Sequence, residues 1–227
     1  MSLDTSIECV LFDLDGTLID TAPDFVEVVA RLCAENKRPA VSEGDIYQTV
    51  SDGARALTKL AFAIDEEHQD FARLNQRLLD IYEQQIATSR SRLYPGLEQL
   101  LGKLEASKIP WGIVTNKPLR YAEALLQVMQ LDKRCASLIC PDHVSERKPH
   151  PEPILLACQQ LQADTERTVY IGDHIRDIQA AKNADVIAVA AAWGYLPADT
   201  LVEEWYADFI LRQPEQFEAL LQTLKFA

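Results

Sequence analysis

The sequence predicts an α/β protein, with a Rossmann-like, doubly wound parallel sheet as its core and an inserted all-α cap subdomain. Short β-rich apolar runs alternate with helical patterns over much of the 227 residues. This alternation is typical of a parallel sheet that carries helices on both faces. Between residues 20 and 90 the alternation stops and every segment has a helical pattern. An all-helical stretch between the first two strands is expected to form an inserted subdomain.

The core elements follow one another in a regular order. Apolar runs that end at polar or turn-forming residues predict the strands, which are expected at 9–12, 111–114, 137–140, 169–172, 186–191 and 209–211. Three- and four-residue apolar spacing predicts the helices between and after them, near 96–107, 118–130, 152–161, 175–184 and 214–225.

The predicted cap contains four helices, at about 22–36, 43–49, 52–63 and 67–88. The last is the clearest, because apolar side chains recur at three- and four-residue steps from Phe71 to Ile86. The domain boundaries that follow are 1–19 and 91–227 for the α/β core and 20–90 for the cap.

Composition narrows the classes of protein and partner. A net charge of −13 argues against nucleic acid as a partner, which requires clustered Lys and Arg. The apolar stretches are too short to span a membrane, and residues 1–8 lack the basic and apolar regions of a secretory signal. Five scattered cysteines without a CxxC pair are typical of reduced thiols in a cytoplasmic protein. The expected partner is a small molecule, and the chain is expected to be a monomer or a small homo-oligomer.

The strongest local signal lies just after the first predicted strand, where Asp13 and Asp15 stand two residues apart and Gly16 follows. Paired carboxylates are costly to bury unless a cation neutralises them, and oxygen ligands suit Mg²⁺. An Asp-Gly turn that merely ends a strand is the alternative interpretation of this pair.

Thr115 and Asp173 also follow predicted strands. In an open α/β sheet, ligands bind beyond the carboxyl ends of the strands. We therefore expect Asp13, Thr115 and Asp173 to lie close together although they are distant in the sequence.

Four ordered motifs resemble those of the haloacid dehalogenase superfamily of phosphatases. They are Asp13-Leu14-Asp15-Gly16-Thr17, then Thr115 with Asn116 and Lys117, then Lys148 before Pro149, and finally the acidic segment Gly172–Asp177. The resemblance spans nearly the whole chain and is similar in detail to the phosphoglycolate phosphatase-like group. It implies that the helical insertion is a C1 cap.

Chemical reasoning and the resemblance predict the same roles for these residues. Asp13 is expected to attack phosphorus, and Asp15 to act as general acid and then as general base. The transferring phosphoryl group is expected to meet the Thr115 hydroxyl, the Lys148 ammonium and the amides of Leu14 and Asn116.

A Mg²⁺ ion is expected at the same place. The predicted ligands are the carboxylates of Asp13 and Asp173 and the main-chain carbonyl of Asp15. Asp177 is expected to stand behind these ligands and to act directly or through water. Lys117, beside Thr115, is expected to face the entrance of the site.

Within the cap, Gly53 and Arg55 are the predicted substrate-binding residues. Gly53 suits a turn or the start of a helix that receives an anion, and Arg55 could bind a substrate carboxylate. A solvated Arg on a helix face is an equally open interpretation. The resemblance implies a small, carboxylate-bearing phosphate ester, N-acetylmuramic acid 6-phosphate first and 2-phosphoglycolate second. A sugar-phosphate mutase, a carbon–halogen hydrolase and a non-catalytic binding protein are the remaining alternatives.

Overall fold

The computed structural model of the chain describes residues 6–224, and its core is one parallel sheet. Residues 1–5 and 225–227 lie outside the described part. Most of the segment considered for a secretory signal, and both ends of the predicted core, therefore also lie outside it. The six strands of the sheet run parallel in the order β5-β4-β1-β6-β7-β8. They are β1 (Cys9–Phe12), β4 (Trp111–Val114), β5 (Ser137–Ile139), β6 (Thr168–Gly172), β7 (Ile187–Ala191) and β8 (Phe209–Leu211). The predicted fold class is confirmed.

Helices cover both faces of this sheet, as expected. The core helices are α5 (Leu97–Ala106), α6 (Leu119–Val128), α7 (Glu152–Leu161), α8 (Ile175–Asn183) and α9 (Gln216–Thr223). Short 3-10 segments also occur, at η2 (Pro141–His143), η3 (Thr165–Arg167) and η4 (Val202–Trp205).

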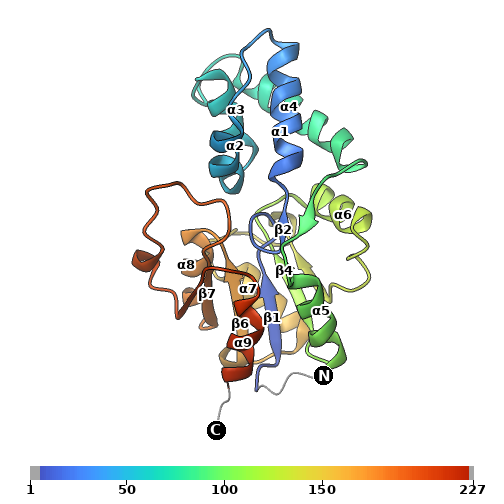
Figure 1. Ribbon diagram of the computed structural model, residues 1–227, viewed down its shortest axis with the longest axis vertical. Helices are drawn as coiled ribbons and strands as arrows, with labels where there is room; N and C mark the ends of the chain where they lie inside the picture. The colour runs from blue at the N-terminus through green and yellow to red at the C-terminus, as the bar shows by residue number, and fades with distance from the viewer. Residues whose placement is uncertain (1–5, 225–227) are drawn as a thin grey trace.

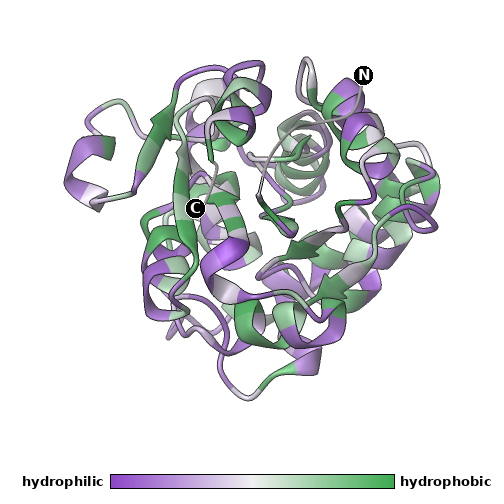
Figure 2. Cartoon of the chain, turned by 90° about the horizontal axis from the view of Figure 1, so that it is seen from below, coloured by the Kyte–Doolittle hydropathy of each residue, from purple (hydrophilic) through white to green (hydrophobic). Residues whose placement is uncertain are grey.

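Alternate residues of the central strand β1 face two different hydrophobic clusters. Val10 and Phe12 belong to the cluster that contains apolar residues of α5, α6 and α9. Cys9 and Leu11 belong to the cluster built with α7 and α8. This division follows from the two-residue period of a strand. In Figure 2 the strands are mostly green, whereas the helices around them carry both colours. The sheet is therefore buried on both faces, and its strand ends are the places left for polar chemistry.

The helical insertion lies beyond the carboxyl ends of the strands, at the top of Figure 1. It contains α1 (Ala22–Glu35), α2 (Glu43–Thr49), α3 (Ala54–Phe62) and α4 (Phe71–Ile86), with the 3-10 turn η1 (Val50–Asp52) before α3. The assignment of residues 20–90 to a separate cap subdomain stays a prediction.

The two chain crossings between the insertion and the sheet contain a feature that the sequence did not indicate. They pair as a short antiparallel ladder of β2 (Ile19–Asp20) and β3 (Arg92–Leu93). Two-residue strands leave no periodic pattern to detect.

Among the described residues, no helix is both long enough and apolar enough to cross a membrane.

Replacing two different glycines of the core by alanine should have opposite effects on stability. Gly102 lies in α5 with open space where a Cβ atom would stand, so Gly102→Ala should raise the free energy of unfolding by about 0.5–1 kcal/mol. Gly112 lies in β4, where a Cβ would stand 2.9 Å from the Ser137 carbonyl oxygen. Overpacking at such a site should make Gly112→Ala less stable by about 1–3 kcal/mol.

Urea denaturation of both variants, followed by circular dichroism, measures these changes. A Gly112→Ala variant as stable as the parent protein would contradict the packing described for the sheet.

Candidate active site

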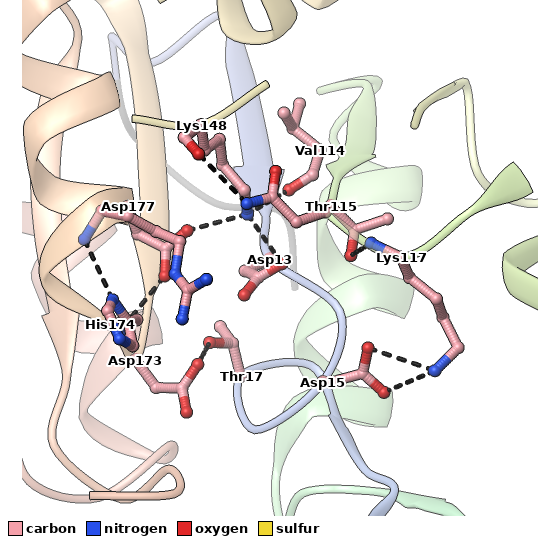
Figure 3. A network of polar contacts seen from close by, with 12 residues as sticks. Asp13, Asp15, Thr17, Val114, Thr115, Lys117, Lys148, Asp173, His174 and Asp177 are labelled. Carbon is pink, nitrogen blue, oxygen red and sulfur yellow. Dashed lines mark hydrogen bonds and ion pairs between the residues drawn. The ribbon is translucent and has the colours of Figure 1, made fainter. Parts of the chain in front are cut away.

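The strand order brings the predicted residues together. Because β1 lies between β4 and β6, the residues that follow these three strands stand side by side at one edge of the sheet. They are Asp13, Thr115 and Asp173, and Figure 3 shows them around one centre with Lys148 and Asp177.

Lys148 is the cation at this centre, and its side chain is only 1% exposed. Its Nζ atom lies 2.8 Å from Oδ1 of Asp13 and 2.8 Å from Oδ1 of Asp177. It also lies 2.8 Å from the Val114 carbonyl oxygen and 2.8 Å from the Tyr170 hydroxyl. One buried ammonium thus joins two motif carboxylates to the end of β4 and to β6.

The carboxylates outnumber this cation. One oxygen from each of Asp13, Asp173 and Asp177 lies within 4.8 Å of the others. Burial raises the pKa of Asp13 to about 6, against the opposing effect of the Lys148 ammonium. Burial, together with the charges of Asp13 and Asp177, raises the pKa of Asp173 to about 7. Three crowded carboxylates with one nearby ammonium form a donor set that could hold a divalent cation. The Asp15 carboxylate is not a member of this group.

Asp173 is held from three directions. Thr17 donates to its Oδ1 atom over 3.1 Å, and the Tyr195 amide donates to Oδ2 over 2.9 Å. The third donor is the hydroxyl of Ser51, 2.9 Å from Oδ2, which belongs to the cap turn η1. A Cβ atom at Gly194 would stand 2.2 Å from the Asp173 Cβ, so only glycine lets the Tyr195 loop approach this closely.

Asp15 faces the other side of the site, toward Lys117 (Figure 3). The Lys117 ammonium lies 2.9 Å and 3.3 Å from its two carboxylate oxygens, and the Thr21 hydroxyl donates to Oδ1 over 2.6 Å. Burial opposes the charge on Lys117, but the Asp15 carboxylate and Tyr82 together outweigh burial, so the pKa of Lys117 is raised. The two motif aspartates are thus paired with two different lysines.

The chain crossings into the cap are fixed by two buried groups. The Tyr195 hydroxyl accepts hydrogen bonds from the amides of Thr21 and Ala22 and donates to Asp20. Asp24, which is fully buried, accepts from the Arg90 amide over 2.7 Å and from the hydroxyls of Ser89 and Ser91. Tyr195 therefore links the first crossing to Asp173 through its own amide.

The remaining predicted residues have varied surroundings. The Asn116 side chain donates to the Lys148 carbonyl oxygen over 3.1 Å, and Leu14 is fully buried. Gly53 is the N-cap residue just before α3 and has a φ of 84°, which agrees with the expected turn. Arg55 has a side chain that is 60% exposed, and its guanidinium pairs with Glu66 instead of with any residue of the acidic cluster. Its role as a reader of substrate stays a prediction.

Sequence reasoning misses several residues that contact the cluster. Tyr170 lies in a predicted strand and Tyr195 follows another, and neither hydroxyl gives a signal of its own in the sequence. Ser51 lies in a cap segment that the sequence singles out for Gly53 and Arg55. Arg176 lies inside the fourth motif, and its guanidinium donates to the Ser51 carbonyl oxygen and the Asp52 carboxylate. Such contacts between cap and core depend on tertiary structure and leave no spacing pattern.

Comparison with known proteins identifies the family. The family model of the haloacid dehalogenase-like hydrolases matches residues 10–191. The chain belongs to the haloacid dehalogenase-like hydrolase family. This agrees with the four motifs, and the prediction of an enzyme of the phosphatase class is confirmed.

Named relatives match nearly end to end. An N-acetylmuramic acid 6-phosphate phosphatase from Pseudomonas putida is 39% identical over 217 residues, which are 96% of this chain and 97% of the relative. A phosphoglycolate phosphatase from Xanthomonas campestris is 41% identical over 210 residues, which are 91% of this chain and 93% of the relative. A crystal structure from Haemophilus somnus, described as a predicted phosphoglycolate phosphatase, superposes with a TM-score of 0.83 at 25% identity. The match covers 95% of this chain and 98% of that one.

Proposed function

We propose that this chain is a Mg²⁺-dependent phosphatase that hydrolyses a small phosphate monoester through an aspartyl phosphate on Asp13. The contact that carries the proposal is the bond of 2.8 Å between the Lys148 ammonium and Oδ1 of Asp13, within a cluster of three carboxylates. A carboxylate held at one oxygen by a buried cation has its other oxygen available for attack, so Oδ2 is the proposed nucleophilic atom.

In the first step Oδ2 of Asp13 forms a bond to phosphorus as the ester P–O bond breaks. The departing alkoxide takes a proton from Asp15, which avoids the cost of releasing an unprotonated alkoxide. In the second step a water molecule attacks the phosphorus of the aspartyl phosphate and gives its proton to Asp15. The bond between phosphorus and Asp13 then breaks, which releases phosphate and restores the carboxylate.

Several donors surround the position of the transferring phosphoryl group. Thr115 is 4% exposed, and its hydroxyl oxygen accepts from the Lys117 amide over 3.1 Å. Its proton is therefore free to donate to a phosphoryl oxygen. The Lys148 ammonium and the amides of Leu14 and Asn116 are the other proposed donors. Donors fixed in a buried site stabilise developing charge without reorganisation, which is the main source of rate in such transfers.

The carboxylates of Asp13 and Asp173 and the main-chain carbonyl of Asp15 are the proposed Mg²⁺ ligands, with Asp177 supporting them. When bound, Mg²⁺ would neutralise carboxylate charge and polarise the phosphoryl group. This requirement fits the raised pKa values of Asp13 and Asp173, since buried carboxylates without enough positive charge resist ionisation.

We further propose N-acetylmuramic acid 6-phosphate as the substrate, and 2-phosphoglycolate as the second candidate. The Pseudomonas putida relative supports the first and the Xanthomonas campestris relative the second, at similar identities. Both compounds carry a carboxylate besides the phosphate, so a cationic group near the site is expected to bind that carboxylate. Arg55 is the proposed group, which requires its guanidinium to leave Glu66 on the cap surface.

The metal assignment predicts that chelation with EDTA abolishes turnover and that added Mg²⁺ restores it. Mg²⁺ at a hundredfold its dissociation constant should also stabilise the folded protein by about 2.7 kcal/mol. The Asp173→Asn variant should lose this stabilisation, as measured by thermal unfolding with and without Mg²⁺. Full activity after exhaustive chelation would remove the metal from the mechanism.

The nucleophile assignment separates the two aspartates of the first motif. Asp13→Asn should have no detectable turnover and form no phosphoenzyme. Asp15→Asn keeps the nucleophile but loses proton transfer, which is worth about 10²–10⁴-fold in rate. Acid quenching and peptide mass spectrometry locate the phosphoryl group. A phosphoryl group on another residue would overturn the mechanism, and equal, mild effects of both changes would make the pair structural.

The substrate assignment predicts a higher kcat/KM for N-acetylmuramic acid 6-phosphate than for 2-phosphoglycolate. If Arg55 binds the carboxylate, Arg55→Ala should remove a charge-assisted bond of about 1.5–3 kcal/mol, which corresponds to a loss of roughly 10- to 150-fold. An ester without a carboxylate should be unaffected. The matched control is Lys59→Ala. Like Arg55, Lys59 lies on α3 and pairs with Glu66. A tenfold preference for 2-phosphoglycolate would reverse the choice of substrate, and an equal loss on all esters would exclude carboxylate recognition by Arg55.

A further inference from the structure

Lys117 occupies a position that its sequence neighbourhood does not explain. It follows Thr115 in the loop after β4, and its side chain is only 6% exposed. The anionic group in contact with its ammonium is the Asp15 carboxylate, whose two oxygens lie at 2.9 Å and 3.3 Å. Lys117 therefore pairs with Asp15, the residue proposed to transfer protons, whereas Lys148 pairs with Asp13, the proposed nucleophile.

The rest of the Lys117 ammonium is enclosed by the cap. It lies 4.6 Å from the centre of the Tyr82 ring and 5.2 Å from the centre of the Phe25 ring. These two rings come from α4 and α1 and stack on each other with centroids 4.5 Å apart and an angle of 16°. A cation against aromatic faces is attracted by their quadrupoles, and more strongly when water is excluded. We call Phe25 and Tyr82 the cap aromatic pair.

Tyr82 also contacts the core, because the centre of its ring lies 5.6 Å from the centre of the Tyr121 ring of α6. Lys117 is therefore the point where three separate parts of the chain meet: the loop after β4, the loop that carries Asp15, and two cap helices. Movement of the cap away from the sheet would remove the aromatic faces and expose the ion pair to water, where such a pair is much weaker.

We propose that Lys117 is a positioning residue for the second half of the reaction, which holds the Asp15 carboxylate where it takes a proton from the hydrolytic water. The cap aromatic pair keeps Lys117 in place, so that closure of the cap and proton transfer by Asp15 are coupled. This inference rests on the proposed aspartyl phosphate mechanism and adds to it a specific function for the cap. A lysine that bound the phosphoryl group instead would affect both steps.

The test uses 4-nitrophenyl phosphate, because its leaving group departs without protonation. Rapid-quench measurements give the rates of formation and of hydrolysis of the phosphoenzyme separately. In Lys117→Met, formation should stay within about threefold of the parent rate and hydrolysis should fall by at least about tenfold, since base catalysis contributes about 10²–10⁴-fold. The phosphoenzyme should then accumulate. The surface variant Lys103→Met, which loses only a contact with Glu218 on α9, is the control and should change neither rate.

A double-mutant cycle distinguishes positioning from a general structural effect. Lys117→Met should cause less than about a threefold further loss of hydrolysis in an Asp15→Asn background, because groups that act as a unit are not additive. Equal losses in both steps, or full additivity with Asp15→Asn, would overturn the inference.

The cap contribution is tested without changing the lysine. Tyr82→Leu removes the aromatic face and should slow hydrolysis selectively by about threefold to tenfold, whereas Tyr82→Phe retains the ring and should leave the rate of hydrolysis unchanged. Circular dichroism confirms that each variant is folded, and Phe25→Leu replaces Tyr82→Leu if that variant unfolds. Identical rates in the Phe and Leu variants would exclude coupling to the cap. A parent enzyme that forms no phosphoenzyme on Asp13 would instead refute the proposed function itself.

Discussion

The burial of several carboxylates at the ends of adjacent strands is the constraint on which the rest of the structure depends. Asp173 and Asp177 are 1% and 0% exposed, and Asp13 lies beside them. Ionised carboxylates are not stable in such a place without positive charge and hydrogen bonds. The Lys148 ammonium supplies positive charge, and its contacts with the carbonyl at the end of β4 and with Tyr170 of β6 tie that charge to the sheet. A buried charge thus fixes the relative positions of three adjacent strands, β4, β1 and β6.

The same constraint explains why the cap approaches the core where it does. Asp173 still has hydrogen-bond capacity after its bonds to Thr17 and the Tyr195 amide, and Ser51 of the cap fills it. Tyr195 meanwhile holds the start of α1 through its hydroxyl. One loop after β7 therefore contacts both the acidic cluster and the first crossing into the cap. Movement of the cap would change the hydrogen bonding of Asp173, so the cap and the cluster are not independent parts.

Much of this arrangement could be predicted from the sequence, because its determinants are local. The strands are short apolar runs that end in polar residues, and Asp13, Thr115 and Asp173 each follow one of them. Their proximity then follows from the parallel sheet alone. The contacts of Ser51 and of the cap aromatic pair could not be predicted, since they depend on how the cap sits above the sheet. Arg55 illustrates the same limit, because a guanidinium near a loop has no sequence signal for its partner, which in the structure is Glu66.

The pairing of each motif aspartate with its own lysine suggests why two similar carboxylates, two residues apart, can have different tasks. Lys148 holds Asp13 within the cluster from the core side, in surroundings built by strands and by α8. Lys117 holds Asp15 from the opposite side, in surroundings completed by cap helices. A nucleophile must be fixed before substrate arrives, and rigid strand ends serve that need. A group that both gives and takes protons must exchange protons with solvent between reactions, but it transfers them best when water is excluded. Surroundings that close and open with the cap meet both needs. The division between core and cap thus corresponds to a division between the two proposed chemical roles.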